Sequence, residues 1–392
     1  MRCMQRQTLY RGNGVWHVAP TVQDTCPQAM APQCACTPRE LAVYPQAAHR
    51  GRDTAAAQRP KLTQGFSRRF GRWLCGLAVL AMLWPVAARA GGPDCPGPRV
   101  TLERLSAQVW RVPGQRGEAT EANRGAISNL LVVHRGRETW LLGSGPTPAF
   151  GRALQCQLRA ATGWRVTDVI APWARPELVL GATAFAGARV WSHADVAAAM
   201  RERCPGCVAR MKARLAGAAR DLGPHPVRIA RHLLQGEQGV LGPFRWWRLQ
   251  RSDATVVTVF RLVDQPLWAA HGLLWADAPP DLRDAELGPM AAAYAKLADL
   301  ALADGAAARW LPEQGEVIGP NAPARHAHYL QQLESDVMAA LREGRLETEP
   351  PTPPAAHTLP LDDGLRHSLN WQRAWHRLEQ RAFDELPAAP AR

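Results

Sequence analysis

The sequence lacks the local signatures from which an enzymatic activity is most often inferred. It contains no Ser-His-Asp elbow, no phosphate-binding glycine loop, and neither heptads nor longer internal repeats. It also lacks an unbroken apolar run of the ~20 residues that a membrane-spanning helix needs. Serine-triad hydrolysis, P-loop nucleotide chemistry and coiled-coil assembly therefore lose their simplest support, and no membrane span is expected in the mature chain.

Acidic residues are scarce at one end of the chain. Residues 1–90 hold 12 Lys/Arg against 3 Asp/Glu, which leaves 35 against 31 for residues 91–392. The formal net charge of +13 therefore falls to +4 over residues 91–392. Because a nucleic-acid partner calls for a strongly basic folded surface, we expect none.

The basic end of the chain has the pattern of an export signal. Ser67–Ala90 combines a cationic start, an apolar run of secretory length and an Ala-x-Ala end. This predicts a signal peptide over residues 66–90, a mature chain that begins at Gly91, and a periplasmic location. The alternative is a short membrane anchor, and both the Sec and the twin-arginine routes stay open. Residues 1–65 show no sustained periodicity and indicate a disordered leader or an over-extended gene start.

Cysteine is sparse after the predicted cleavage site. Of the nine cysteines only Cys95, Cys156, Cys204 and Cys207 remain. Four thiols in an oxidising compartment allow three disulfide patterns, and we expect Cys95–Cys156 or Cys204–Cys207. Cys204-Pro-Gly-Cys207 also has the spacing of a redox dithiol, for which a structural disulfide or loop staple is the alternative.

Hydrophobic periodicity over residues 91–392 predicts two β-rich runs, each closed by helices. Strands are expected at Val100–Val112, Asn129–His134, Glu138–Leu142, Thr167–Ile170, Ala188–Ser192, Phe244–Leu249, Thr255–Leu262, Leu267–Trp275 and Arg309–Leu311. Helices are expected at Pro148–Ala161, from Glu177, at Ala194–Ala218, Asp284–Ala303, Ala322–Glu343 and, after the Pro-rich linker Glu349–Pro354, at His367–Phe383. This order predicts a layered α/β sandwich in a single domain.

Four stretches carry a resemblance to a known family. They are "EATEANRGAISNLLVV" (Glu118–Val133), "PELVLGATAF" (Pro176–Phe185), "PDLRDAEL" (Pro280–Leu287) and "RHSLNWQRAWHRLE" (Arg366–Glu379). From about Val100 to Glu379 the chain resembles the metallo-β-lactamase superfamily, and more narrowly the periplasmic zinc metallohydrolase-like proteins associated with quinoprotein relay systems. The resemblance implies a four-layer αββα sandwich with a metal site at one edge between its sheets.

The same resemblance shows which metal ligands are missing. The family motif H-x-H-x-D-H falls on Trp173, Arg175, Glu177 and Leu178, of which only Glu177 can donate to a metal. The later ligand positions fall near Gln250, near Gly272 and on Gln314, and Gly143 stands where the first hairpin of the family ends in Asp. Scaffold residues beside them persist, namely Gly145, Pro176, Gly181 and Gly315.

Arg175 decides against zinc in the family's position. A guanidinium cannot be a ligand, and a few ångströms from a dication it would add several kcal/mol of repulsion at an effective dielectric of about 20. We therefore expect no cofactor, although zinc is the metal of the family. A displaced site remains an alternative, because His134, Glu177, His193, Asp195 and His271 lie near strand ends. Helix capping by His193 and Asp195, and an ordinary strand-end role for His271, are the competing interpretations.

Aromatic residues are expected around the vacated position. The resemblance places Trp173, Trp246, Trp247 and Trp275 there, with His271 and Arg175. They either plug the space or line a pocket for a small anionic or quinone-like ligand.

One interpretation of Asp281, Arg283 and Asp284 is an acid/base site. The alternative is structural: Asp284 caps the next helix and Arg283 pairs with a neighbouring acid. His367, Asn370 and Arg373 are expected to be structural. The sequence thus favours an exported, non-catalytic binding or accessory protein near a periplasmic quinoprotein system. The alternative is a metal-dependent hydrolase with a displaced or unaligned site.

Overall fold

The computed structural model describes residues 9–12, 15–18, 95–224, 226–348 and 365–384. The predicted signal peptide, the start at Gly91 and the Pro-rich linker lie outside the described residues. The chain divides into two compact units, Met1–Ala81 and Met82–Arg392. The described part of the first unit is an antiparallel hairpin of β1 (Leu9–Gly12) and β2 (Val15–Val18). The fold described below belongs to the second unit.

One layer is a seven-stranded sheet with its strands in sequence order. They are β3 (Glu103–Ser106), β4 (Val109–Val112), β5 (Leu130–Arg135), β6 (Glu138–Leu142), β7 (Asp168–Ala171), β8 (Arg189–His193) and β9 (His232–Leu234). Strands β3 to β6 pair antiparallel, whereas β6 to β9 pair parallel. Parallel neighbours require crossover connections, and helices supply each of these.

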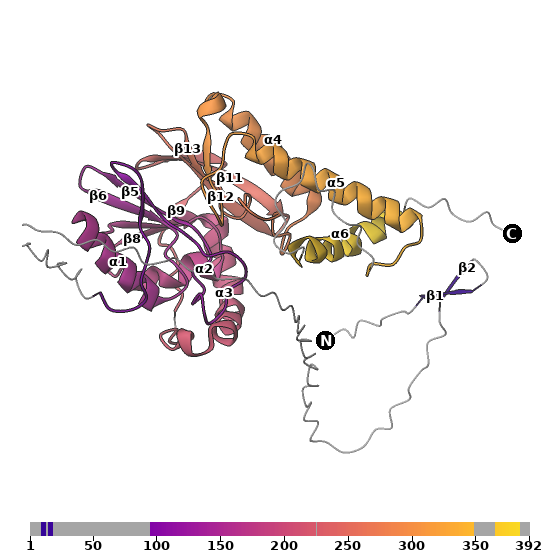
Figure 1. The fold of residues 1–392 in the computed structure, drawn as a ribbon, viewed down its shortest axis with the longest axis horizontal. Coiled ribbons are helices and arrows are strands. Elements are labelled where there is room, and N and C mark those ends of the chain that lie inside the picture. The colour runs from indigo at the N-terminus through magenta and orange to yellow at the C-terminus, as the bar shows by residue number, and fades with distance from the viewer. Residues whose placement is uncertain (1–8, 13–14, 19–94, 225, 349–364, 385–392) are drawn as a thin grey trace, which may run out of the picture. The chain divides into compact units, whose positions relative to one another are not determined.

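The crossover helices are α1 (Pro148–Thr162), α2 (Pro176–Val179) and α3 (Ala194–Leu215), with the 3-10 segments Leu180–Ala184 and Ala216–Ala219 after α2 and α3. The start of α1 is fixed by Thr147, whose side chain accepts a hydrogen bond from the Phe150 N–H at 3.2 Å. Its buried stripe includes Leu154 and Leu158, one turn apart. Figure 1 shows α1 and α3 beside the same sheet.

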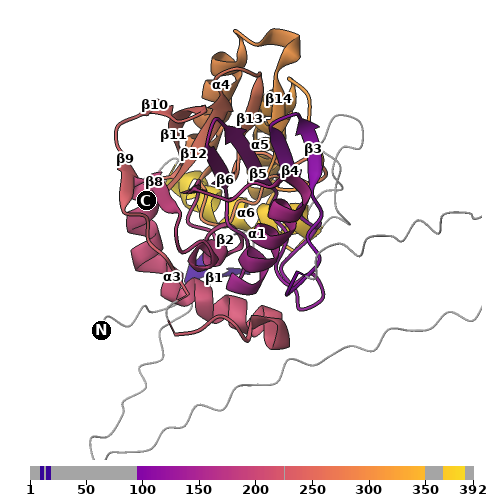
Figure 2. The same ribbon diagram turned by 90° about the vertical axis from the view of Figure 1, so that its left-hand side faces the viewer.

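A second, five-stranded sheet packs against the first. Its strands are β10 (Gln238–Leu241), β11 (Phe244–Ser252), β12 (Thr255–Leu262), β13 (Leu267–Ala269) and β14 (Arg309–Leu311), antiparallel except for the parallel pair β13–β14. Helices α4 (Leu287–Ala301), α5 (Ala322–Arg342) and α6 (Leu365–Asp384) follow in chain order, with a short 3-10 segment at Gly305–Ala307. Figures 1 and 2 show α4 and α5 on the side of this sheet that faces away from α1.

The space between the sheets is filled by alternate side chains of facing strands. Leu131, Val133 and Leu142 come from the seven-stranded sheet, and Phe244 and Phe260 come from the five-stranded sheet, all within one buried cluster. The intervening residues, such as Val132 and Leu141, belong to a second cluster that includes the helices. This two-residue period places each sheet between the other sheet and a helical layer, and it confirms the predicted four-layer αββα sandwich.

Strands β9 and β10 were not predicted, most other limits differ by a few residues, and three predicted elements differ in kind or in their start. The run Val100–Val112 is a hairpin, β3 and β4, rather than one strand. The run Leu267–Trp275 is a strand for only three residues, because the chain turns after Ala269 and the Leu274 N–H bonds to the Ala270 carbonyl at 3.1 Å. The helix expected from Asp284 begins at Leu287, and Asp284 has a left-handed φ of 53° instead of capping it. That capping interpretation was wrong.

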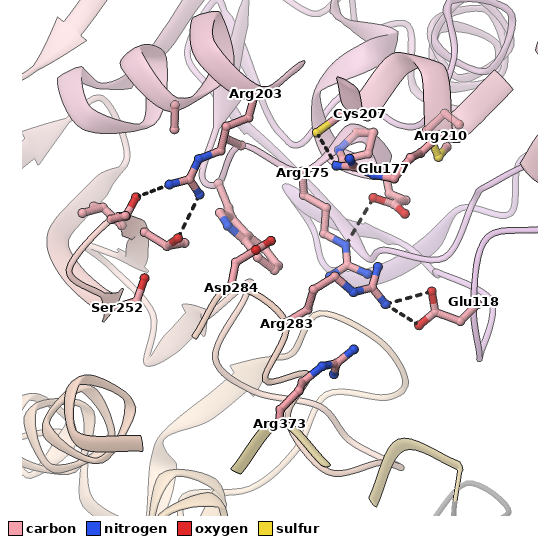
Figure 3. A pocket seen from close by; sticks show the side chains of 18 of the residues that line it. Glu118, Arg175, Glu177, Arg203, Cys207, Arg210, Ser252, Arg283, Asp284 and Arg373 are labelled. Carbon is pink, nitrogen blue, oxygen red and sulfur yellow. Dashed lines mark hydrogen bonds and ion pairs between the residues drawn. The ribbon is translucent and has the colours of Figure 1, made fainter. Parts of the chain in front are cut away.

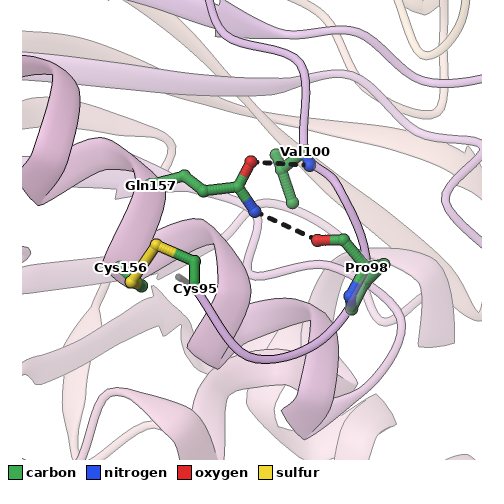
Figure 4. The surroundings of a disulfide bond; sticks show 5 residues. All are labelled: Cys95, Pro98, Val100, Cys156 and Gln157. Atoms are coloured by element: carbon green, nitrogen blue, oxygen red, sulfur yellow. Dashed lines mark hydrogen bonds between the residues drawn. A yellow bond between two sulfur atoms is a disulfide. The ribbon is translucent and has the colours of Figure 1, made fainter. Parts of the chain in front are cut away.

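Cys95 and Cys156 form a disulfide that joins the start of the described domain to α1 (Figure 4). Next to it, the Gln157 side chain accepts from the Val100 N–H and donates to the Pro98 carbonyl, both at 3.0 Å. Cys204 and Cys207 are free and buried in α3. Among the described residues, no helix combines the length and apolar composition that crossing a membrane requires.

Candidate functional site

The loop that carries the degenerate motif leaves the carboxyl end of β7. In α/β folds this edge is where connecting loops gather and ligands bind. The loop is tied to the scaffold at Leu178, whose carbonyl accepts from the Ser144 N–H at 2.6 Å and from the Ser144 hydroxyl at 3.0 Å. Next to it only glycine fits at position 181, since a Cβ there would lie 2.0 Å from the Ser144 carbonyl oxygen. The backbone of the loop is therefore held closely.

Arg175 points from this loop into a buried group of acids. Its Nε lies 3.2 Å from Glu177 Oε2 and 3.9 Å from Glu313 Oε1, and its Nη1 lies 3.3 Å from Asp281 Oδ2. Burial by itself lowers the pKa of Arg175, but these carboxylates and Glu118 outweigh it and raise the pKa above its ordinary value. The guanidinium is permanently charged and occupies the centre of the cluster.

A second buried cation lies beside it. The guanidinium carbon of Arg251 lies 4.3 Å from the centroid of the Trp173 ring, and that of Arg175 lies 5.1 Å from the same ring. Arg251 also donates to the backbone carbonyl of Asp281. Desolvation lowers the pKa of Arg251 to about 10, so this group is still charged at neutral pH. Trp173 is thus held by two cation–π contacts.

Arg251, not Gln250, is the β11 residue that reaches this position. Gln250 is exposed, whereas Arg251 is fully buried. Adjacent side chains of a strand point to opposite faces, and the pairing of β11 with β12 shifts between Gln250 and Ser252. The sequence prediction put Gln250 near this position, and the residue that lies there is its neighbour Arg251.

Gly272 and Glu313 complete the cluster. Gly272 has φ 78°, and a Cβ added to it would lie 2.9 Å from the Trp173 ring, so the indole fills the space that a side chain at 272 would need. The Gly272 N–H donates to Glu313 Oε2 at 3.0 Å, and the Ser128 hydroxyl donates to the other oxygen of Glu313. Gln314 instead donates to the Gly117 carbonyl at 3.0 Å.

We call Arg175, Arg251, Glu177, Asp281 and Glu313 the buried charge cluster. The residues at this place do not fit zinc. Trp173 and Leu178 offer no lone pair of the kind that zinc takes, and two guanidiniums lie among the acids. Within the described residues there is also no grouping of three His, Cys, Asp or Glu side chains suited to a metal ion.

The residues considered for a displaced metal site are dispersed among other roles. His193 caps α3, because its Nδ1 accepts from the Asp195 N–H at 3.2 Å, while Asp195 accepts from Arg248 at 2.7 Å. His134 stacks on Trp164 with ring centroids 4.5 Å apart. His271 is fully buried and donates through Nε2 to the Asn129 carbonyl at 2.7 Å, and desolvation lowers its pKa.

The four tryptophans expected around the vacated position do not gather at one place, and only Trp173 fills space there. Trp246 lies in the core between the sheets, 5.9 Å from the His193 ring, and Trp247 stacks on Trp268 at 5.0 Å. Trp275 is buried near Arg366. Trp246 and Trp247 are neighbours on β11 and face opposite sides of it, whereas Trp173 and Trp275 lie in loops. Of the four, only Trp173, with Arg175, lines the cleft described below.

That cavity is a cleft of about 990 Å³ in front of the loop (Figure 3). It lies between α3, the loop after β7, the β11–β12 turn and α6. Its charged lining consists of seven arginines and four carboxylates: Arg175, Arg203, Arg210, Arg214, Arg283, Arg373 and Arg377, with Glu118, Glu177, Asp284 and Glu286. We call this space the basic cleft.

Asp281 lies beneath the cleft and is not arranged as an acid or base. Its Oδ1 accepts from the Arg283 N–H at 2.9 Å and from Arg373 Nη1 at 3.1 Å. Burial by itself raises the pKa of Asp281, but Arg175, Arg283 and Arg251 lower it well below its usual range. The group therefore remains a carboxylate. Arg283 also pairs with Glu118 at 3.2 Å, as the structural interpretation expected.

Residues of the last helix hold the floor of this region together. Asn370 accepts from the Leu282 N–H at 3.2 Å and donates to the Pro280 carbonyl at 2.7 Å. His367 lies 3.2 Å from the Tyr329 hydroxyl. These are structural contacts, as expected from the sequence.

Comparisons with known proteins give similarity at low identity. No protein-family model matches the sequence, and neither does any curated protein. Among solved structures, the metallo-β-lactamase FIM-1 from Pseudomonas aeruginosa in its mono-zinc form is similar, with a TM-score of 0.47 and 16% identity over 60% of this chain and 97% of that one. The metallo-β-lactamase from Hirschia baltica has a TM-score of 0.45 and 14% identity over 59% and 98%. The fold class rests on the two sheets and their helices rather than on these scores.

The sequence predictions did not include Arg251, Glu313 or four arginines of the cleft, namely Arg203, Arg210, Arg214 and Arg377. A signal for these arginines was present, because Arg203, Cys207, Arg210 and Arg214 recur at the three- and four-residue spacing that aligns side chains on one helix face. Arg373 and Arg377 repeat that spacing on α6. Nothing local marks Arg251 or Glu313, because each depends on pairing with a distant strand or loop.

Proposed function

We propose that this chain is a non-catalytic binding protein that takes a small molecule carrying several anionic groups in the basic cleft. The observation that carries the proposal is a surplus of positive charge in a cavity of ligand size. The lining has three more arginines than carboxylates, in a volume of about 990 Å³. Known small-molecule sites reach about 1,000 Å³.

Three cleft arginines are available to a ligand. Among the described residues, Arg203 donates to the Thr255 hydroxyl and the Ala254 carbonyl, and Arg210 donates to a thiol. Within the described part of the chain, neither of them nor Arg377 pairs with a carboxylate. Guanidiniums bind carboxylate and phosphate groups through paired N–H donors, so a polyanion is the ligand class that they suit.

The proposal also includes a location and a role for the protein. The signal-peptide pattern supports a periplasmic protein that begins at Gly91. The sequence resemblance supports an accessory role near a quinoprotein system, with the zinc ligands of the family lost. A quinone-like ligand with carboxylates would satisfy both the resemblance and the charge of the cleft. Mass spectrometry of protein taken from the periplasm tests the predicted start, because an intact Met1 terminus there would contradict cleavage before Gly91.

The binding test uses calorimetric titration of the purified chain with citrate, inorganic phosphate and benzene-1,3,5-tricarboxylate at low salt. We expect at least one polyanion to bind and its affinity to fall as salt is raised. The variant R203Q/R210Q/R377Q should bind it at least about tenfold more weakly, since each lost charged contact contributes about 1.5–3 kcal/mol.

The matched control is R201Q/R325Q/R342Q, which removes the same charge from exposed helix positions outside the cleft. It should bind like the unmodified protein. Equal weakening by both triple variants, or no binding of any polyanion, would overturn the proposal. A flat aromatic tricarboxylate that binds more tightly than citrate would favour the quinone-like ligand.

A further inference from the structure

Two free thiols lie in the wall of the basic cleft. Cys204 and Cys207 are one helical turn apart on α3, with 0% and 5% of their surfaces exposed. Residues three apart on a helix lie on the same face. Cys207 lines the cleft, whereas Cys204 lies behind it in the core. The Cys207 sulfur therefore faces the cleft, and the Cys204 sulfur lies one helical turn away, where it can react with Cys207.

The helix is locally modified between these thiols. Pro205 has no N–H, so the backbone hydrogen bond that this position would normally make to the preceding turn is absent. A disulfide needs its Cβ atoms about 3.5–4.5 Å apart, somewhat closer than the ~5–6 Å of helical neighbours. A missing backbone bond lowers the resistance of the helix to that adjustment.

The surroundings of Cys207 favour the thiolate. Arg210 Nη2 donates to the Cys207 sulfur at 3.3 Å (Figure 3). A hydrogen bond from the Cys204 thiol and, to a smaller extent, the charge of Arg210 lower the pKa of Cys207 to about 7, against the raising effect of burial. The pKa of Cys204 is raised, chiefly by its hydrogen bond to Cys207 and by burial. Cys207 therefore forms a thiolate more readily than Cys204 does.

We propose that Cys207 and Cys204 form a thiol–disulfide exchange site whose substrates are small disulfides that carry carboxylates. The Cys207 thiol, which lines the cleft, attacks, the Cys204 thiol behind it resolves, and the arginines of the cleft hold the substrate by its negative charges. This inference rests on the proposed anion binding for its selectivity, although the exchange chemistry of the two thiols does not depend on it.

The reaction balances without a further reagent. The Cys207 thiolate attacks one sulfur of the substrate RS–SR, forms a mixed disulfide and releases RS⁻. Cys204 then loses its proton and attacks the Cys207 sulfur, which breaks the mixed disulfide and releases the second RS⁻. The two released thiolates take up protons. The protein dithiol is oxidised to a disulfide, and RS–SR is reduced to two RSH.

The test compares three small disulfides on the full chain by intact-mass and peptide-mass analysis. Glutathione disulfide is anionic, 2-hydroxyethyl disulfide is neutral and cystamine is cationic. At low salt we expect glutathione disulfide to react about tenfold or more faster than cystamine, since a charged cleft raises encounter with counter-charged molecules by that order. The C204S variant should accumulate a glutathione mixed disulfide on Cys207, because no resolving thiol remains.

Two variants isolate the site. C204S/C207S supplies the background from the cysteines at 3, 26, 34, 36 and 75. R210Q changes an exposed side chain, so it should fold normally and should lower both the rate and the preference for the anionic disulfide. No mixed disulfide on Cys207 in C204S, or equal rates for the three disulfides, would overturn the inference.

Failure of this inference can be told apart from failure of the proposed function. If polyanions bind in calorimetry but Cys207 does not exchange, only the exchange site is lost. If Cys207 exchanges without charge preference and no polyanion binds, both the selectivity and the proposed binding function are lost.

Discussion

The buried charge cluster and the basic cleft share Arg175 and lie next to each other, yet they use arginine in opposite ways. In the cluster, Arg175 is only 6% exposed and has three carboxylates within 4 Å. In the cleft, Arg203 is half-buried and Arg210 exposed, and neither has a carboxylate partner among the described residues. The first arrangement neutralises charge in the interior, and the second presents charge to solvent.

This difference separates stability from binding. A buried charge is tolerated only when partners repay its desolvation, and removal of one partner leaves the others unpaired. An exposed charge costs little to keep and contributes little to folding, so it is free to bind a ligand. We therefore expect substitutions in the cluster to change the free energy of unfolding and substitutions in the cleft to change affinity.

The largest effect is expected from Arg175→Met. The methionine keeps much of the volume but removes the charge, and Glu177 and Glu313 lose their nearest cation. The free energy of unfolding in urea should fall by about 3–5 kcal/mol. The matched change in the cleft, Arg203→Met, should cost under about 1 kcal/mol. A loss from R175M no greater than that from R203M would remove the distinction between the two regions.

The disulfide between Cys95 and Cys156 lies outside both regions and gives a reference value for a loss of unfolding free energy. Cys95 and Cys156 close a loop with a sequence separation of 61 residues. Their joint replacement by alanine should lower the unfolding free energy by about 2–4 kcal/mol. Unlike a change in the cluster, this loss should be the same at pH 4 and pH 7, because no titrating group is involved. Free thiols at both Cys95 and Cys156 in protein purified without reducing agent would contradict the bond itself.

Acid should weaken the cluster through Asp281. Its pKa is lower in the folded than in the unfolded protein, so its contribution is complete above the unfolded value and is lost as pH falls through the folded one. The difference in stability between the unmodified protein and Asp281→Asn should therefore shrink, by about 1 kcal/mol or more, between pH 7 and pH 3. Urea unfolding at several pH values measures it. A constant difference would show that Asp281 acts through shape and not through charge.

Zinc should produce the smallest effect. Ligands raise the melting temperature only when they bind the folded state, and the cluster presents guanidiniums where the metal would lie. Excess zinc should not shift the melting temperature, and the purified protein should hold zinc well below one equivalent. Tight stoichiometric zinc, or a hydrolase activity lost on Glu177→Ala, would overturn the non-catalytic proposal. A design that restores zinc would have to replace Arg251 as well as Trp173 and Arg175, since Arg251 lies against Trp173.

The sequence by itself determined the layered α/β sandwich and the absence of metal donors at positions 173, 175 and 178. Both follow from local properties. The apolar period along each segment decides whether it forms a strand or a helix, and the chemistry of a side chain decides whether it can donate a lone pair. For the same reason the limits of β6, β12 and β14 agree with those expected from the sequence.

Only the tertiary structure decided which charges meet. Arg251 is buried on β11 and Gln250 is exposed, next to a shift in strand pairing, and the sequence of β11 does not show that Arg251 lies beside Arg175 and Trp173. Glu313 reaches Arg175 from a strand end 138 residues further along the chain, and Asp281 reaches it from 106 residues away. The cleft likewise needs α3 and α6 to lie on either side of one loop. The pairing of charges depends on distances between segments remote in sequence, and folding alone sets those distances.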